Sequence, residues 1–151
     1  MHVHQLKNKK ATSRHPFQFF RSGLSNVYLT GIDYAVCRCG ARETCYPLPL
    51  EMMNSLAKLV SEKTTRLTPS EIRFLRKSLG KDHKGFAQLV GVTITQVSRW
   101  ENGKSAPSTS AEKLIRCLAG GTSLRTPAEF NQRERYMLHF EKRKWNGKFQ
   151  G

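Results

Sequence analysis

Apolar residues recur at helical spacing between residues 67 and 120, and residues that start and stop helices stand between them. The first run opens on "TPSE" (68–71), which has the form of a capping box with proline at the first helical position. Glycines end the successive runs. The apolar positions are Ile72, Leu75 and Leu79; Phe86, Ala87 and Val90; Val97 and Trp100; and Ala111, Leu114, Ile115 and Leu118. This pattern predicts four short helices.

The second and third predicted helices are separated only by the turn Gly91-Val92-Thr93. Thr93 forms a second capping box with Gln96, so the third helix starts directly after the turn. Two helices joined by a short turn and enclosed by two more form a helix-turn-helix unit, whose second helix enters the DNA major groove. We therefore predict a DNA-binding domain over residues 67–120.

The third helix has two distinct faces. Val97 and Trp100 share one face, because each residue turns a helix by about 100°. Thr95 and Arg99 point the other way and offer a hydroxyl and a guanidinium, two groups that read base edges well. The apolar face predicts an anchor in the core, so Trp100 is interpreted as a core residue rather than a base-stacking platform.

Residues 17–63 follow a different pattern. Short β-rich runs, "FQFF", "NVYLT", "YAVC" and "ETCY", are separated by turn residues, which predicts a small antiparallel sheet. The stretch "PLPLEMMNSLAKLVSEK" (47–63) then places its apolar residues on one helical face. We expect a small β-rich domain with a connecting helix, and an α+β fold in which this region precedes the all-α helix-turn-helix domain.

The two ends of the chain receive separate predictions. Residues 1–16 are polar, basic and aperiodic, so they are interpreted as a flexible basic arm. In the tail, "TPAE" at 126–129 has the form of another capping box and predicts a C-terminal helix over 126–146. This helix has more apolar residues than a solvated basic helix needs. We therefore favour a role in dimer contact over the two alternatives, which are covering the core and bracing DNA phosphates. The apolar residues are Phe130, Tyr136, Met137 and Phe140.

Charge narrows the range of partners. The chain has 26 Lys and Arg against 11 Asp and Glu, a formal charge of +15 with a pI near 10.2. The excess is spread along the whole chain, which favours double-stranded DNA as the partner.

No apolar run of membrane-spanning length and no signal peptide is present, so we expect a cytoplasmic protein without membrane contact. No glycine-rich phosphate loop, HExxH motif or nucleophile elbow appears, and we predict no enzymatic activity.

The series Phe86-Ala87, Gly91-Val92 and Val97-Ser98-Arg99-Trp100-Glu101-Asn102-Gly103 resembles the Cro/phage-repressor (Xre) type of helix-turn-helix domain. The resemblance covers residues 67–119. It implies an ion pair between Arg76 and Glu101 that orients the reading helix. The positions that it assigns to DNA contact are His83, Lys84, Thr93, Ile94, Thr95, Gln96, Ser98, Arg99, Lys104 and Ser105.

Three of these positions carry particular expectations. His83 stands where the family usually has a phosphate-contacting glutamine, and the alternative is an exposed loop histidine. Exposure of the apolar Ile94 side chain to water is unfavourable, but the side chain packs well against a thymine methyl group. Arg99 is interpreted as a guanine reader, against the alternatives of a phosphate contact or a solvated side chain.

Over 17–119 the chain also resembles the MqsA-type antitoxins and their regulator relatives, whose front domain holds zinc between two cysteine pairs. Here the first pair is absent and the second is Cys37-Arg38-Cys39-Gly40, a degenerate zinc-ribbon-like remnant. Structural zinc requires about four ligands, and the spacing of Cys45, His2 and His4 is irregular. We therefore expect no cofactor, with Cys37, Cys39 and Cys45 as weak metal candidates. Cys117 is predicted to be a small core residue.

Two functions follow from these features. In the first, the protein is a sequence-specific transcription regulator, an autoregulatory repressor that binds a palindromic operator as a homodimer. In the second, it is the antitoxin of a type II toxin-antitoxin system, whose front domain (17–63) neutralises a small toxin by direct binding.

Overall fold

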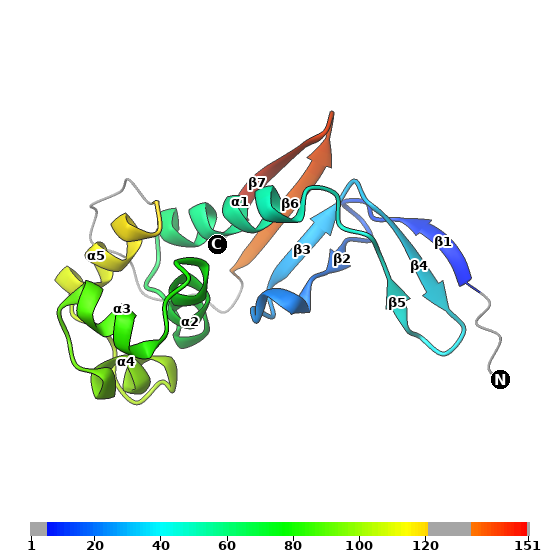
Figure 1. The fold of residues 1–151 in the computed structure, drawn as a ribbon. Helices are drawn as coiled ribbons and strands as arrows, with labels where there is room; N and C mark the ends of the chain where they lie inside the picture. The colour runs from blue at the N-terminus through cyan, green and yellow to red at the C-terminus, as the bar shows by residue number, and fades with distance from the viewer. Residues whose placement is uncertain (1–5, 121–133, 151) are drawn as a thin grey trace.

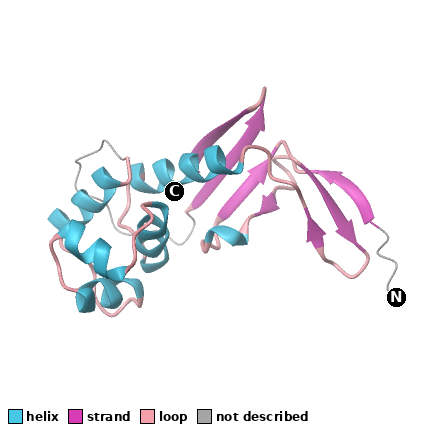
Figure 2. Ribbon diagram, viewed as in Figure 1, coloured by secondary structure: helices cyan, strands magenta, loops and turns pink. Residues whose placement is uncertain are grey.

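The computed structural model describes residues 6–120 and 134–150. Strands gather at one end of the molecule and short helices at the other, with the longest helix, α1, running between them (Figures 1 and 2). The elements of the strand region are β1 (Leu6–Lys10), β2 (Phe17–Gln18), a 3-10 turn (Phe20–Ser22), β3 (Val27–Thr30), β4 (Asp33–Cys37), β5 (Arg42–Glu43), β6 (Arg135–Glu141) and β7 (Lys144–Gln150). The helices are α1 (Pro49–Glu62), α2 (Pro69–Ser78), α3 (His83–Val90), α4 (Ile94–Glu101) and α5 (Thr109–Leu118). This is the expected α+β fold.

The described strands form two sheets, in the orders β1-β4-β5 and β2-β3-β6-β7. All neighbouring strands are antiparallel except β3 and β6, which run parallel with Val27 opposite Tyr136. The second sheet therefore joins a strand that precedes the helices to strands that follow them. Helix α1 covers its apolar face, where Val27, Leu29 and Leu138 are fully buried.

The predicted C-terminal helix is wrong over the described part of the tail, which forms the β6–β7 hairpin. Tyr136 and Leu138 alternate with outward-facing residues, so the apolar period is two, as in a half-buried strand. Tyr136 is completely buried within its own chain and is not available for the predicted dimer contact, which stays a prediction for the half-buried Met137 and Phe140. The capping box at 126–129 and Phe130 lie outside the described residues.

The predicted flexible arm is also wrong over residues 6–10, which form β1. This strand pairs antiparallel with β4, from Leu6 opposite Cys37 to Lys10 opposite Asp33. All five of its side chains are exposed, so the strand has no hydrophobic period that the sequence could show. A lysine-rich strand at a sheet edge also resists pairing with another chain.

A third correction concerns α5, where the predicted core residue Cys117 is exposed and Leu114 is 39% exposed. The helix instead buries Glu112, Ile115 and Arg116. Arg116 Nη2 donates to Glu112 Oε1 at 2.8 Å, one helical turn away. This buried ion pair takes the position expected for apolar side chains and turns Cys117 toward solvent.

A buried polar cluster connects the tail to the helical domain. Lys63 Nζ lies 2.7 Å from Glu71 Oε2 and 3.0 Å from Glu134 Oε2, and Tyr136 Oη donates to Glu71 Oε1 at 2.6 Å. Burial, followed by the charge and hydrogen bond of Glu71, raises the pKa of Tyr136 far above its ordinary value. The phenol therefore keeps its proton and acts as a donor. Because Glu71 also caps α2, the cluster ties β6 to the start of that helix.

Gly31, directly after β3, is expected to tolerate no side chain. Its φ is +78°, and a Cβ placed there would lie 2.2 Å from the carbonyl oxygen of Phe140 on β6. We predict that Gly31→Ala lowers the free energy of unfolding by about 2–4 kcal/mol, as measured by urea denaturation. Gly23 is the matched control, since its φ of +82° imposes the same strain while its surroundings are open. An equal loss for Gly23→Ala would contradict the proposed clash.

Candidate nucleic-acid interface

Helices α3 and α4 pack against each other around a tight turn (Figure 1). Gly91 adopts a left-handed conformation with φ of 79°, which ends α3 and redirects the chain. Asp82 Oδ1 caps α3 by accepting from the Gly85 amide at 2.7 Å, and Thr93 caps α4 by accepting from the Gln96 amide at 3.1 Å. The helix-turn-helix geometry therefore follows from caps encoded in the local sequence.

The two faces of α4 differ as the sequence predicts. Val97 and Trp100 are buried, at 0% and 4% exposure. Ile94 is 50% exposed, and Thr95 and Arg99 also face solvent. Of the residues expected to contact DNA, Ser98 alone is half-buried, and the following are exposed: His83, Lys84, Thr93, Ile94, Thr95, Gln96, Arg99, Lys104 and Ser105. The expected residues thus lie on α4, its preceding turn, and the ends of the neighbouring segments.

Gln96 takes part in the cap of its own helix. Its Oε1 accepts from the Thr93 amide at 2.9 Å, completing the capping box. The side-chain oxygen is therefore occupied, and the amide nitrogen Nε2 is the group that can donate to DNA. A contact from Gln96 to a phosphate or to a base acceptor is compatible with this geometry.

Glu101, at the end of α4, is the centre of a charged cluster. Arg76 of α2 contacts it with two groups, Nε to Oε1 at 2.6 Å and Nη2 to Oε2 at 3.2 Å. Burial alone would raise the pKa of this carboxyl, but the hydrogen bonds and charges of Arg76 and His83 hold the pKa below its usual range. The cluster therefore stabilises the fold fully at pH values above the usual pKa of a glutamate. This contribution is lost as the pH falls through the lowered pKa.

His83 faces this cluster, with Nε2 3.0 Å from Glu101 Oε2. The side chain remains 46% exposed at the start of α3. The contact with Glu101 orients the imidazole through Nε2. Arg73, which the sequence interpretation omitted, also reaches Glu101, with Nε 3.4 Å from Oε2.

The segment after α4 folds back on the helix. The amides of Lys104 and Ser105 donate to the Arg99 carbonyl at 2.9 and 3.4 Å. These two residues can therefore offer their side chains, but not their main-chain amides, to a phosphate. Gly103, with φ of 71°, makes the reversal possible.

Two of the predicted weak metal candidates lie close together at the end of β4. Cys37 and Cys39 interact with each other, and this contact raises the pKa of Cys37 and lowers that of Cys39. Within residues 6–120 and 134–150, no three His, Cys, Asp or Glu side chains come together as metal ligands would. His2 and His4 lie outside the described residues.

Together, helices α2–α5 and the outward face of α4 define a helix-turn-helix DNA-binding module. The helix-turn-helix family matches residues 72–118. The chain is 30% identical over 82 residues to the HTH-type transcriptional regulator YiaG of Escherichia coli K12, and equally to its counterparts in strains O6:H1 and O157:H7. Each alignment covers 49% of this chain and 85% of the relative, so the chain belongs to this family of HTH-type transcriptional regulators.

No solved structure matches the chain. Among the described residues, no helix has the length and apolar character needed to cross a membrane.

Proposed function

We propose that the protein is a repressor that binds a palindromic operator in its own promoter as a homodimer. The observation that carries this proposal is the outward face of α4, where Ile94, Thr95 and Arg99 are exposed on a helix anchored by Val97 and Trp100. Two such helices in a dimer would contact half-sites about one DNA turn, or ~34 Å, apart. The proposed mechanism is occupation of the promoter and requires no catalytic step. Toxin neutralisation by residues 17–63 stays a prediction from the resemblance alone.

Footprinting on the DNA upstream of the protein's own gene tests this function directly. We expect protection of two half-sites related by two-fold symmetry and separated by about one helical turn or a multiple of it. Sedimentation of the complex would give two chains per operator. Protection of one isolated half-site, or of no site, would contradict the proposed autoregulatory dimer.

Salt is expected to weaken operator binding steeply. A dimer that neutralises about 6–10 phosphates should show a log–log slope of affinity against salt of roughly −5 to −9. The net charge of +15 and the exposed basic residues beside α4 support this expectation. Fluorescence anisotropy across a range of salt concentrations measures the slope, and a flat profile would exclude the proposed phosphate contacts.

Arg99→Ala is expected to relax the sequence preference without unfolding the protein. Arg99 is exposed, so its removal leaves the core intact. Loss of a base contact should cost about 1–3 kcal/mol per half-site and reduce the preference at one base position. Selection of binding sites from random DNA compares the variant with the wild type, and Lys104→Ala is the control, since loss of a phosphate contact weakens all sequences alike. An unchanged motif for Arg99→Ala would remove it as a base reader.

A further inference from the structure

The strand region is more basic than the DNA-binding domain. Residues 6–47 and 134–150 together contain twelve Lys and Arg against four Asp and Glu, whereas residues 67–120 contain nine against four. The helix-turn-helix domain therefore accounts for less than half of the net charge. This excess of positive charge away from the reading helix indicates a second surface for an anionic partner.

Two adjoining hollows concentrate this charge on the outer side of the strands. They have volumes of about 660 and 620 Å³ and share Arg14, Pro16 and Tyr28 in their walls. We call the pair the strand groove. Its cationic lining residues are Lys9, Lys10, Arg14, Arg42, Arg135 and Lys148. Among the described residues of its lining there is no aspartate or glutamate, so nothing in the walls opposes an anion.

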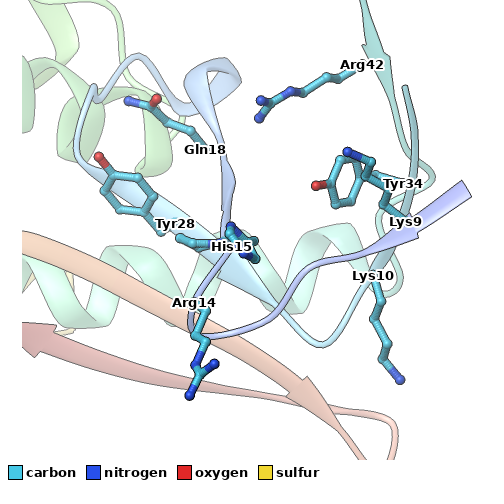
Figure 3. A pocket seen from close by; sticks show the side chains of 9 residues that line it. Lys9, Lys10, Arg14, His15, Gln18, Tyr28, Tyr34 and Arg42 are labelled. Atoms are coloured by element: carbon cyan, nitrogen blue, oxygen red, sulfur yellow. The ribbon is translucent and has the colours of Figure 1, made fainter. Parts of the chain in front are cut away.

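Aromatic rings lie between these cations. Tyr28 is half-buried on the outer face of β3 and lines both hollows, with the Arg135 guanidinium 5.6 Å from its ring centroid. Tyr34 stands on the opposite wall and is held by Phe17, whose ring centroid is 5.3 Å away. Figure 3 shows the two tyrosines on opposite sides of the first hollow, with the Arg42 side chain reaching across toward Gln18.

We propose that the strand groove binds single-stranded nucleic acid. The cations are placed to contact successive phosphates, and the Tyr28 ring offers a surface on which an unpaired base stacks. An acidic protein segment would match the charge but would make no use of the half-buried Tyr28 ring. A duplex keeps its bases stacked internally and offers Tyr28 no base face. This activity is separate from operator recognition by α4.

The test measures anisotropy of a fluorescein-labelled oligothymidylate of about 15 nucleotides with the full chain. Reversing one charge in each hollow, by Arg42→Glu with Lys148→Glu, should weaken binding at least ~10-fold at low salt. The matched control, Lys58→Glu with Lys77→Glu, changes the net charge equally at exposed positions on α1 and α2 and should cost less than ~2-fold.

Tyr28 is tested by two substitutions that both suit a strand. Tyr28→Phe keeps a stacking ring and should bind as the wild type does, whereas Tyr28→Thr should lose about 5- to 100-fold in affinity. Arg99→Ala, which removes the proposed base reader, should leave this binding unchanged. An oligouridylate of equal length is measured alongside, and the tighter of the two probes identifies RNA or DNA as the preferred strand.

Three results would overturn the proposal. They are an equal loss in the Lys58/Lys77 control, a loss with Arg99→Ala, and equal competition by an unlabelled duplex of unrelated sequence. Operator binding by the groove variants is measured in parallel, which distinguishes the strand groove from the α4 surface. A failure of the proposed repressor function would leave the single-strand binding result unchanged. Thermal melting of each variant confirms that it is folded.

Discussion

Replacing Lys63 by methionine is expected to lower the free energy of unfolding by about 3–5 kcal/mol, measured by urea denaturation. The ammonium group is completely buried and lies within 3.0 Å of carboxylate oxygens from both Glu71 and Glu134. Methionine matches the length of the side chain but leaves two acidic side chains close together without this cation. Their repulsion and desolvation, rather than lost packing, produce the expected loss.

The compensated variant Lys63→Met with Glu71→Gln and Glu134→Gln is the control. It removes the carboxylate charges together with the cation, while each glutamine still has an oxygen to accept hydrogen bonds. We expect it to recover a large part of the lost stability, because replacing a whole buried ionic cluster costs less than breaking it. A triple variant no more stable than Lys63→Met would show that the charges are not the cause.

Trp100→Ala is expected to cost about 3–5 kcal/mol of stability before any DNA is added. The side chain is 4% exposed in the core beneath α4, so its removal creates a cavity. The loss should appear as a lower melting temperature. At a temperature where both proteins are folded, the sequence preference of the bound fraction should be unchanged, because Trp100 contacts no base in the proposed complex.

Arg99→Ala provides the opposite pattern on the neighbouring residue, with unchanged melting and a changed preference. The pair of variants therefore separates anchoring from reading on a single helix. If Trp100→Ala melts as the wild type does but loses one base preference, the assignment of the two faces of α4 is wrong.

The helical domain could be predicted because its signals are local. Thr68 with Glu71 and Thr93 with Gln96 form the predicted capping boxes, and Gly91 ends α3 in the left-handed conformation that glycine favours. Such signals depend on residues three or four positions apart. They are readable without any knowledge of the tertiary structure.

The C-terminal hairpin could not be predicted in the same way. Its turn uses Lys142 and Arg143 at φ of 49° and 62°, whereas sequence patterns lead one to expect asparagine or glycine there. Gly147 directly follows the end of the predicted helix, but it lies inside β7, where a Cβ would approach Leu59 Cδ1 to 2.5 Å. The glycine permits close packing of α1 on the sheet rather than a turn.

The candidate site shows the same limit. Its position on α4 follows from helical spacing, and the structure contains the Arg76–Glu101 pair that the resemblance implied. The orientation of His83 toward Glu101 and the strand groove depend on residues far apart in sequence. No local pattern joins Tyr28 to Arg135, although the dispersed charge indicated that the basic character extended beyond one domain.

The parallel pairing of β3 with β6 has a consequence for biosynthesis. Residues 27–30 leave the ribosome long before residues 135–141, and the entire helix-turn-helix domain is made between them. The nascent chain therefore exposes one side of β3 until its partner arrives, while the contacts between α2, α3, α4 and α5 join residues that have already been synthesised. The DNA-binding domain is thus expected to fold first during translation, and the sheet to close last.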